Sequence, residues 1–352
     1  MPGDTPATVI VVAHNAAQYI GETLDALLSD PEGPVEVIVV DNGSTDATTE
    51  VVAQRPTVRI HARQTNDGFG AGANAGVELA TQAVVAVIND DVQVSPGWLP
   101  PLVDALDADG VGAASATVAL TDDPASFNTS GGAVTVSGMA WITDLGGPIP
   151  TDEAGSVTIP FPSGAAFAMR RSNWERLGGF RDDFFLYHED TDLGWRLRMR
   201  GLRSVRVPGS RVMHRYDFAR NPGKLGLLER NRLRMVLTNY RRSTVLLLTP
   251  VLVLHEVGTL AVSLRDRWFR SKVRSWRTGA LGGAGRARYR ATQDERVVGD
   301  AEILAERTGS MASIPIPEVR VPRGTGIVDR LTRVYVRAVI PLVRILDRRR
   351  GL

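Results

Sequence analysis

Apolar runs and helical patterns alternate along the first part of the chain. The runs are almost unbroken and rich in β-branched residues, which is typical of parallel strands buried on both faces. They predict strands at 8–13, 35–40, 58–61 and 83–88. Between them, apolar residues recur at helical spacing and predict helices at 16–28, 46–54 and 70–81. This alternation predicts an α/β fold built on a doubly wound, mostly parallel sheet.

The pattern continues less regularly beyond this region. We expect further helices at 96–106, 172–177 and 189–200, and further strands at 112–120 and 205–212. Gly, Ser, Thr and Pro punctuate the stretch 121–162, which predicts short hairpins and a loop.

The last third of the chain has a helical pattern. A basic helix is expected at 225–240, and the stretch 327–346 alternates apolar residues with arginines, as an amphipathic helix does. The stretch 245–264 is mostly apolar but contains His255 and Glu256. Its uninterrupted part is too short to span a bilayer. We therefore expect it to lie in the plane of a membrane or to pack inside the protein.

Charge is divided unevenly along the 352 residues. Residues 1–200 carry 10 Lys and Arg against 27 Asp and Glu, whereas residues 201–352 carry 31 against 12. The basic part needs a polyanionic partner, for which nucleic acid and an anionic membrane are the candidates. The absence of cysteine excludes disulfides, thiolate catalysis and cysteine-based zinc sites.

Polar and acidic residues follow two of the predicted strands. Asp41 comes directly after one strand, and Asn89, Asp90 and Asp91 follow another. Ligands of doubly wound sheets bind beyond the carboxyl ends of the strands, and Mg²⁺ or Mn²⁺ prefers oxygen ligands. His214, beyond a later strand, is a candidate further ligand. The alternatives are solvated turn acids, an Asx turn at Asp41 instead of contact with a nucleobase, and a structural role for His214.

A third acidic cluster lies at 184–196, where Glu189, Asp190 and Asp192 are flanked by large apolar side chains. Carboxylates held against an apolar wall have raised proton affinity and can serve as general bases. They are also favourable in the first turn of the predicted helix.

The segment 66–76 is dense in glycine. Glycine allows the backbone to approach a phosphate closely, and a helix start offers free N–H donors. A tight turn into a closely packed helix explains the same glycines. The sequence leaves both interpretations open.

Taken in order and spacing, these motifs resemble those of family 2 glycosyltransferases with the GT-A fold. The nearest resemblance is to bacterial rhamnosyltransferase-like and galactofuranosyltransferase-like members, and it covers roughly residues 8–240. The matching segments are 9–15, 40–46, 66–76, 89–91, 163–165 and 187–193.

The resemblance implies inverting transfer from a nucleotide-diphosphate sugar to a hydroxyl of a glycan or lipid-linked acceptor in cell-envelope polysaccharide synthesis, with Mn²⁺ or Mg²⁺ as cofactor. Asp190 matches the catalytic base, and Glu189 and Asp192 would support the acceptor or orient the helix. The metal ligands would be Asp91 and His214. Nucleotide-sugar binding is implied for His14, Asn15, Asp41, Asn66, Asn74, Asn89 and Asp90; Asn89 departs from the all-acid version of its motif.

We also expect a division of the chain. Residues 1–222 would form the catalytic domain, with a nucleotide-sugar half at 1–118 and an acceptor half at 119–222. Residues 223–352 would form a basic helical extension that associates with a membrane or with a second copy. We expect a bacterial enzyme that is cytoplasmic and peripheral on the inner face of the plasma membrane, because arginine and tryptophan suit anionic headgroups. No nucleic-acid-binding motif is recognisable, and no signal peptide is expected.

Two other functions fit parts of the pattern. A sugar-phosphate nucleotidyltransferase shares the α/β sheet and the metal-binding acids, but usually has a glycine-rich basic loop after the first strand, which 13–16 is not. A non-catalytic basic adaptor for membrane or nucleic acid would use only residues 201–352.

Overall fold

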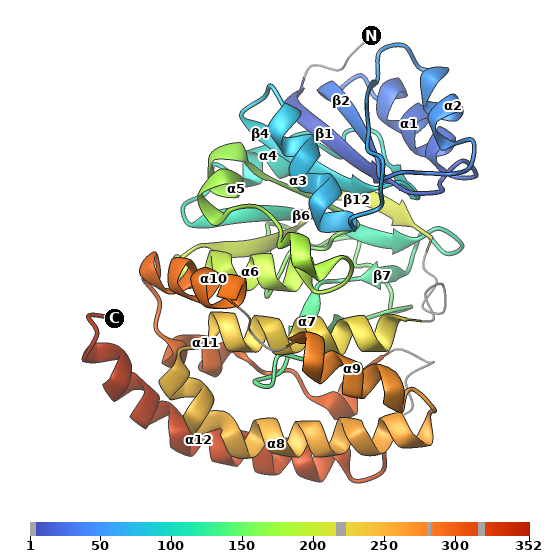
Figure 1. Cartoon of the computed structure of the whole chain (residues 1–352). Helices are drawn as coiled ribbons and strands as arrows, with labels where there is room; N and C mark the ends of the chain where they lie inside the picture. The colour runs from blue at the N-terminus through green and yellow to red at the C-terminus, as the bar shows by residue number, and fades with distance from the viewer. Residues whose placement is uncertain (1–4, 216–222, 280–282, 316–320) are drawn as a thin grey trace. The chain divides into compact units, whose positions relative to one another are not determined.

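The computed structural model describes residues 5–215, 223–279, 283–315 and 321–352. Contacts divide the chain into two compact units (Figure 1). Unit 1 comprises Met1–Gly132, Asp144–Leu197 and Leu202–Asp217, and unit 2 comprises Ala133–Thr143, Arg198–Gly201 and Phe218–Leu352. The boundary predicted at residue 222 lies outside the described residues.

Unit 1 is built on one mixed sheet with the strand order β10-β12-β6-β11-β4-β1-β2-β3, to which β5 and β7 add at β12 and β6. Strands β1 to β4 are mutually parallel where they pair, and β6 pairs with β12 in parallel. The predicted mostly parallel α/β sheet is thus confirmed. The strands are β1 (Thr5–Ala13), β2 (Pro34–Asp41), β3 (Arg59–Ala62), β4 (Val84–Asn89), β5 (Val92–Val94), β6 (Val111–Leu120), β7 (Phe127–Thr129), β10 (Val157–Ile159), β11 (Ala166–Arg170) and β12 (Arg203–His214).

Helices cover both faces of this sheet, so that alternate residues of each central strand enter different cores. In β1, Val9 and Val11 pack with α1, α2 and α4, whereas Ile10 and Val12 pack with α3, α5 and α6. This arrangement explains why the strands are apolar without alternation. The helices are α1 (Ile20–Ser29), α2 (Thr48–Ala53), α3 (Phe69–Leu79), α4 (Pro100–Ala105), α5 (Arg171–Leu177), the 3₁₀ turn η1 (Asp182–Phe184) and α6 (Glu189–Met199).

Unit 1 differs from the sequence prediction most clearly at β11 and at the start of α1. Strand β11 was not predicted, because its short apolar run has no periodicity that separates strand from helix. It runs antiparallel between β4 and β6. Helix α1 begins at Ile20 and not at residue 16. The backbone N–H groups of residues 14–17 donate to side chains distant in sequence, at positions 44, 46, 48 and 90.

Unit 2 consists of one hairpin and a set of helices. Helix α7 packs against α9 and α10, and α12 packs against α8 and α11. The elements are β8 (Gly132–Val134), β9 (Ala140–Ile142), α7 (Lys224–Asn239), α8 (Arg242–Arg265), α9 (Phe269–Gly279), α10 (Gly283–Asp294), α11 (Asp300–Glu306), the 3₁₀ turn η3 (Met311–Ser313) and α12 (Thr325–Arg348).

A buried ion network joins α7, α8 and α9. Arg232 donates to Glu229 at 3.1 Å, and Lys272 donates to Glu229 and, at 2.7 Å, to Glu256. The Nε2 atom of His255 lies 3.5 Å from Glu229. Burial alone would raise the pKa of Glu229, but the charges of its neighbours hold that pKa well below its usual range.

The same network offers acid and histidine atoms within 4.8 Å of one another, at Glu229, His255 and Glu256. Two carboxylates of this group already face two cations, Arg232 and Lys272. A divalent ion there would add excess positive charge to a buried site, so we interpret the group as a salt-bridge network that fixes the helices.

Candidate active site

The motifs of unit 1 meet at one edge of the sheet. In the parallel register Ala13 lies opposite Asp41, and Val12 lies opposite Asn89, so β1, β2 and β4 end together. Strand β11 begins at the same edge, where Ala165 accepts a hydrogen bond from the N–H of Asn89 at 3.1 Å. The three acidic segments of the sequence therefore converge.

The loop between β1 and α1 is held by side chains from the neighbouring strand ends. The N–H of His14 donates to Asp90 at 3.2 Å, and the N–H of Asn15 donates to Ser44 at 2.9 Å. Asn15 adopts a left-handed backbone, with φ of 52°, and its side chain accepts from the N–H of Thr45 at 2.8 Å. His14 and Asn15 thus lie against the loop that follows Asp41; their contact with a nucleotide stays a prediction.

Asp41 is buried at the end of β2, where its carboxylate accepts the N–H of Ser44 at 3.1 Å. This local bond, to the residue three positions on, is close to the Asx turn considered as an alternative for this residue. The adjacent Asn42 donates to the carbonyl of Gly68 at 2.9 Å and accepts from Arg63 at 3.2 Å. These contacts join the β2 end to the start of α3.

The glycines of 66–76 serve close packing. A Cβ at Gly68 would lie 2.0 Å from the carbonyl oxygen of Phe185, and one at Gly76 would lie 2.4 Å from Ile10. Gly68 also has a φ of 98°, which only glycine adopts without strain. For these positions the structure favours the packed-helix interpretation over a phosphate loop. Asn66 caps this turn by accepting the N–H of Gly68 at 2.9 Å.

Asn74 ties α3 to the segment that precedes α6. Its amide donates to the carbonyl of Phe180 at 2.9 Å and to Asp182 at 2.5 Å, and its oxygen accepts the N–H of Phe180 at 2.9 Å. The side chain is therefore engaged within the protein, and contact with substrate stays a prediction.

The structure brings Asp91 and His214 together; their role as metal ligands stays a prediction. The Nε2 atom of His214 is 3.2 Å from Oδ1 of Asp91 and 3.3 Å from Nδ2 of the Asn89 side chain. Its Nδ1 atom is 3.2 Å from Asn128, which orients the ring. One carboxylate oxygen and one imidazole nitrogen at this spacing fit a divalent ion such as Mn²⁺ or Mg²⁺.

Glu189 and Asp190 form a carboxylate pair in the first turn of α6. The Oδ2 atom of Asp190 faces the N–H of Gly164 at 3.4 Å, and Oδ1 accepts the N–H of Thr191 at 2.6 Å. Burial raises the pKa of Asp190. Burial, and then the nearby charge of Asp190, raise the pKa of Glu189 to about 8. The two carboxyls therefore titrate as a pair, in which burial favours the protonated form of each.

The backbone before this pair is strained. Phe185, Tyr187 and His188 have φ values of 64°, 72° and 67°, which non-glycine residues rarely adopt. Such strain is retained where the surroundings impose it, and it concentrates at functional sites. Here the carbonyl of Phe185 accepts the N–H of Phe69 at 2.8 Å, which holds the segment against α3.

Asp192 is fully buried and anchors α6. Its Oδ2 accepts from Arg181 at 2.8 Å and from Arg196 at 2.6 Å. Arg196 also donates to the carbonyls of Leu177 and Gly179, both at 2.8 Å. The residue therefore orients the helix that carries Asp190, the second of the two roles considered for it.

Sequence reasoning did not find several of these residues. Arg181 and Asn128 reach the site from segments with no recognisable motif, and Arg63 lies on a loop of ordinary composition. Only the pairing of Asp192 with Arg196, four residues apart on one helix, could have been predicted.

The pKa of Glu189 leads to a stability prediction. When the pKa of a carboxyl is higher in the folded state than in the unfolded state, the folded state binds more protons, and the free energy of unfolding is larger at low pH than at high pH. For Glu189 this contribution is fully present below pH 4.5 and is lost as pH rises to about 8. We expect Glu189→Gln, which keeps the neutral form, to be more stable than wild type at pH 9 by roughly 2–4 kcal/mol and similar at pH 4.5. Denaturant unfolding across this range measures the difference. Equal pH dependence in the two proteins would contradict it.

The comparisons with known proteins agree with this geometry. A family model described as glycosyl transferase family 2 matches residues 8–178. An N-acetylglucosaminyl-diphospho-decaprenol L-rhamnosyltransferase of Mycobacterium tuberculosis is 31% identical over 232 residues, which covers 58% of this chain and 75% of that protein.

Two solved structures show a similar fold. GalNAc-T7 with UDP, GalNAc and Mn²⁺ matches with a TM-score of 0.54 at 18% identity, and the match covers 66% of this chain. The match spans 48% of GalNAc-T7, about half of its length. TarS 1–349 of S. aureus in complex with UDP-GlcNAc matches with a TM-score of 0.51 at 15% identity, covering 86% of this chain and 90% of that one.

Proposed function

This chain belongs to glycosyltransferase family 2, and from that premise we propose that it transfers rhamnose from a nucleotide-diphosphate donor to a hydroxyl of a lipid-linked acceptor in cell-envelope polysaccharide synthesis, with inversion at the anomeric carbon. The choice of sugar and acceptor is supported by the name of the mycobacterial relative, which combines L-rhamnosyl transfer with a diphospho-decaprenol. The enzyme would act on the cytoplasmic face of the plasma membrane.

The observation that supports this chemistry most is the position of Asp190. Its carboxylate lies beside Gly164, at the sheet edge where β4 ends at Asn89 and is followed by Asp90 and Asp91. Asp190 removes the proton of the acceptor hydroxyl as the oxygen attacks the anomeric carbon from the face opposite the diphosphate. A single displacement inverts the configuration, so no covalent intermediate forms on a carboxylate.

The other residues bind and orient the donor. Asp41, His14 and Asn15 lie at the ends of the adjacent strands β1 and β2, and their polar side chains suit a nucleobase and ribose. Asp91 and His214 would hold Mn²⁺ or Mg²⁺. When bound, the ion would neutralise charge that builds up on the departing diphosphate.

A nucleotide-binding experiment tests the donor site. We expect the nucleoside diphosphate of the true donor to raise the unfolding midpoint, and Mn²⁺ to raise it further; a ligand at a hundredfold excess over its Kd contributes about 2.7 kcal/mol. Asp91→Asn should remove the Mn²⁺ increment and keep the effect of nucleotide alone. Asp122→Asn, an exposed loop acid, is the matched control. An unchanged Mn²⁺ increment in Asp91→Asn would remove this residue from the metal site.

Product analysis separates this function from its alternatives. Acceptor-dependent release of a nucleoside diphosphate from deoxythymidine-diphosphate rhamnose supports the transferase. Release of pyrophosphate from a nucleoside triphosphate and a sugar phosphate would instead indicate a nucleotidyltransferase. Absence of turnover with salt-sensitive binding to anionic surfaces would indicate an adaptor.

A further inference from the structure

Helix α8 has two opposite faces of different character. One stripe, which includes Thr244, Leu248, Val251 and His255, is buried within unit 2. The opposite stripe is apolar and exposed to solvent, and it carries no charged residue between its first and last members. Its members are Leu246, Val253, Leu254, Val257 and Leu264.

Helix α12 repeats this arrangement and adds charge. Its buried stripe includes Val336, Val339 and Val343. Opposite that stripe, exposed apolar side chains recur every three or four residues, at Ile327, Leu331, Val334, Ala338, Leu342 and Ile345. Along one flank, exposed arginines recur at Arg330, Arg333, Arg337, Arg344 and Arg348.

The acids of α12 are turned inward. Asp329 is buried and accepts from Ser310 and from the N–H of Ala312. Asp347 is buried and accepts the N–H of Ala301 at 2.9 Å. All the charge that this helix presents to solvent is therefore positive.

The two helices lie side by side (Figure 1). The hydroxyl of Tyr335 on α12 donates to the carbonyl of Leu247 on α8 at 2.7 Å. Their exposed apolar stripes, together with the arginine flank, are called the α8–α12 face below.

Helix α8 is long and apolar enough to cross a membrane by length and composition, since its 24 residues extend roughly 36 Å. The buried network argues against crossing. His255 and Glu256, in the middle of α8, contact α7 and α9: His255 faces Glu229, and Glu256 accepts from Lys272 at 2.7 Å and from Trp276 at 2.5 Å. A spanning helix would lose these partners and place a carboxylate at the bilayer centre, which costs several kcal/mol.

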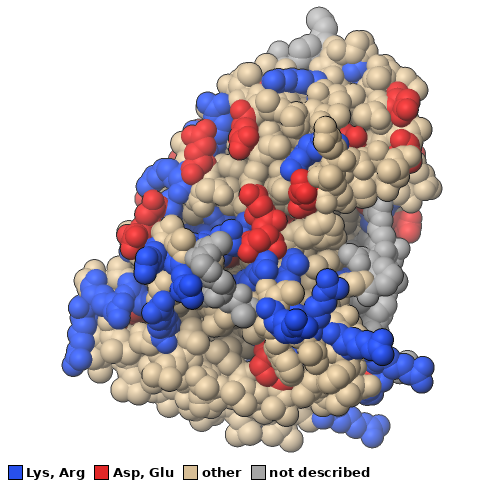
Figure 2. Space-filling model, viewed as in Figure 1, with Lys and Arg blue, Asp and Glu red and all other residues tan. Residues whose placement is uncertain are grey.

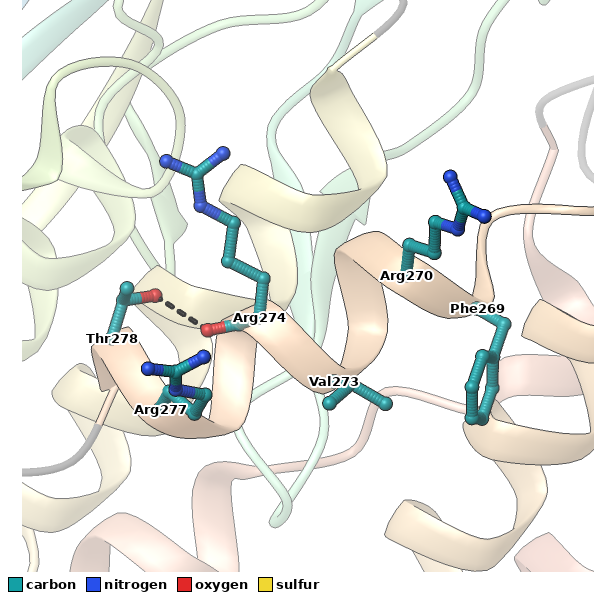
Figure 3. Close-up of a pocket in the computed structure, with 6 residues that line it drawn as sticks. All are labelled: Phe269, Arg270, Val273, Arg274, Arg277 and Thr278. Atoms are coloured by element: carbon teal, nitrogen blue, oxygen red, sulfur yellow. Dashed lines mark hydrogen bonds between the residues drawn. The ribbon is translucent and has the colours of Figure 1, made fainter.

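Helix α9 adds a basic hollow beside this network. It has a volume of about 570 Å³ and is lined by Phe269, Arg270, Val273, Arg274, Arg277 and Thr278. Arg270 and Arg274 extend from one side of the helix, and Phe269 extends from the other (Figure 3). In Figure 2, Lys and Arg side chains gather over α9 and α10, whereas the surface over α8 is mostly uncharged.

We propose that the α8–α12 face docks on an anionic lipid bilayer, with both helices lying in the membrane plane at the boundary between headgroups and acyl chains. The proposal rests on the membrane location proposed above and identifies the surface responsible for it. Apolar side chains enter the acyl region, and the arginines along the flank meet anionic headgroups. A second copy is a poorer occupant, because two arginine flanks would repel each other.

Vesicle binding tests the surface. We expect the whole 352-residue chain to sediment with vesicles of phosphatidylglycerol and phosphatidylcholine, and much less with pure phosphatidylcholine. Leu331→Glu with Val334→Glu should weaken this binding at least about tenfold. Both positions are 61% exposed, so the fold should tolerate the change. Val297→Glu, at a position 62% exposed and outside the face, is the matched control. If the double variant binds these vesicles as tightly as the Val297→Glu control, the proposal is wrong.

Depth measurements test the in-plane orientation. The chain has no cysteine, so single cysteines at Leu246, Val253 and Leu264 can carry a fluorophore without competing labels. Helices in the membrane plane predict similar, shallow quenching by nitroxide lipids at all three sites. Deep quenching at Val253 with shallow quenching at the two ends would show that α8 spans the bilayer.

Failure of membrane docking can be distinguished from failure of the proposed sugar transfer. Nucleotide-dependent thermal stabilisation in the absence of lipid reports the donor site alone. If the double variant keeps that stabilisation and loses vesicle binding, the surface is assigned. If vesicle binding is absent in wild type and the mass in solution corresponds to a dimer that the double variant dissociates, the face is an interface between copies and the proposal is wrong.

Discussion

Replacing Asp190 by asparagine is expected to lower the rate of sugar transfer by about 10²–10⁴-fold, the contribution of a well-placed general base. The amide matches the carboxylate in shape, and its oxygen can still accept the N–H of Thr191. It cannot accept the proton of the acceptor hydroxyl. Rapid-quench assays with saturating donor and acceptor measure the loss.

The control for this experiment is nucleotide binding by the same variant. Stabilisation by nucleoside diphosphate should be unchanged, because Asp190 faces the acceptor side in the proposed mechanism, and Asp122→Asn should keep full activity. Wild-type-like turnover in Asp190→Asn would remove the residue from the base role. Because burial raises the pKa of Asp190, the rate should also increase with pH through a range above that of a free aspartate.

Replacing Asp192 by alanine is expected to destabilise unit 1 by about 3–5 kcal/mol, which is the cost of leaving buried charges without a partner. Asp192 is fully buried, and both Arg181 and Arg196 donate to the same oxygen. Unfolding in guanidinium chloride, followed by circular dichroism, measures the loss.

The chain offers a matched comparison for Asp192. Asp25 pairs with Arg55 at 2.7 Å, but its side chain is 68% exposed. Asp25→Ala removes the same type of contact at the surface and should cost no more than about 1 kcal/mol. Similar losses in the two variants would mean that Asp192 does not anchor α6 as described.

Much of the fold could be predicted from local patterns. The apolar runs that became β1, β2 and β4 are buried on both faces, and such strands must carry apolar residues at every position. Strand β11 escaped prediction because a five-residue run has no diagnostic period. The start of α1 was predicted too early because its loop is held by Ser44, Thr48 and Asp90, which are distant in sequence.

The site was predicted in part for the same reason. Residues that follow strands, such as Asp41 and Asp91, are placed by the parallel register itself. Asn128 and Arg181 come from segments whose approach depends on the whole fold, and the left-handed backbone before Glu189 has no sequence signature.

The order of apolar and acidic segments along the chain by itself determined the α/β sheet, the edge at which the acidic segments meet, and the family resemblance. Strand burial and strand-end position are local consequences of sequence. Only the tertiary structure decided that His214 meets Asp91, that Asp192 anchors α6, and that α8 buries one face and exposes the other. Those outcomes depend on contacts between residues far apart in the chain, and such contacts exist only after the elements have packed.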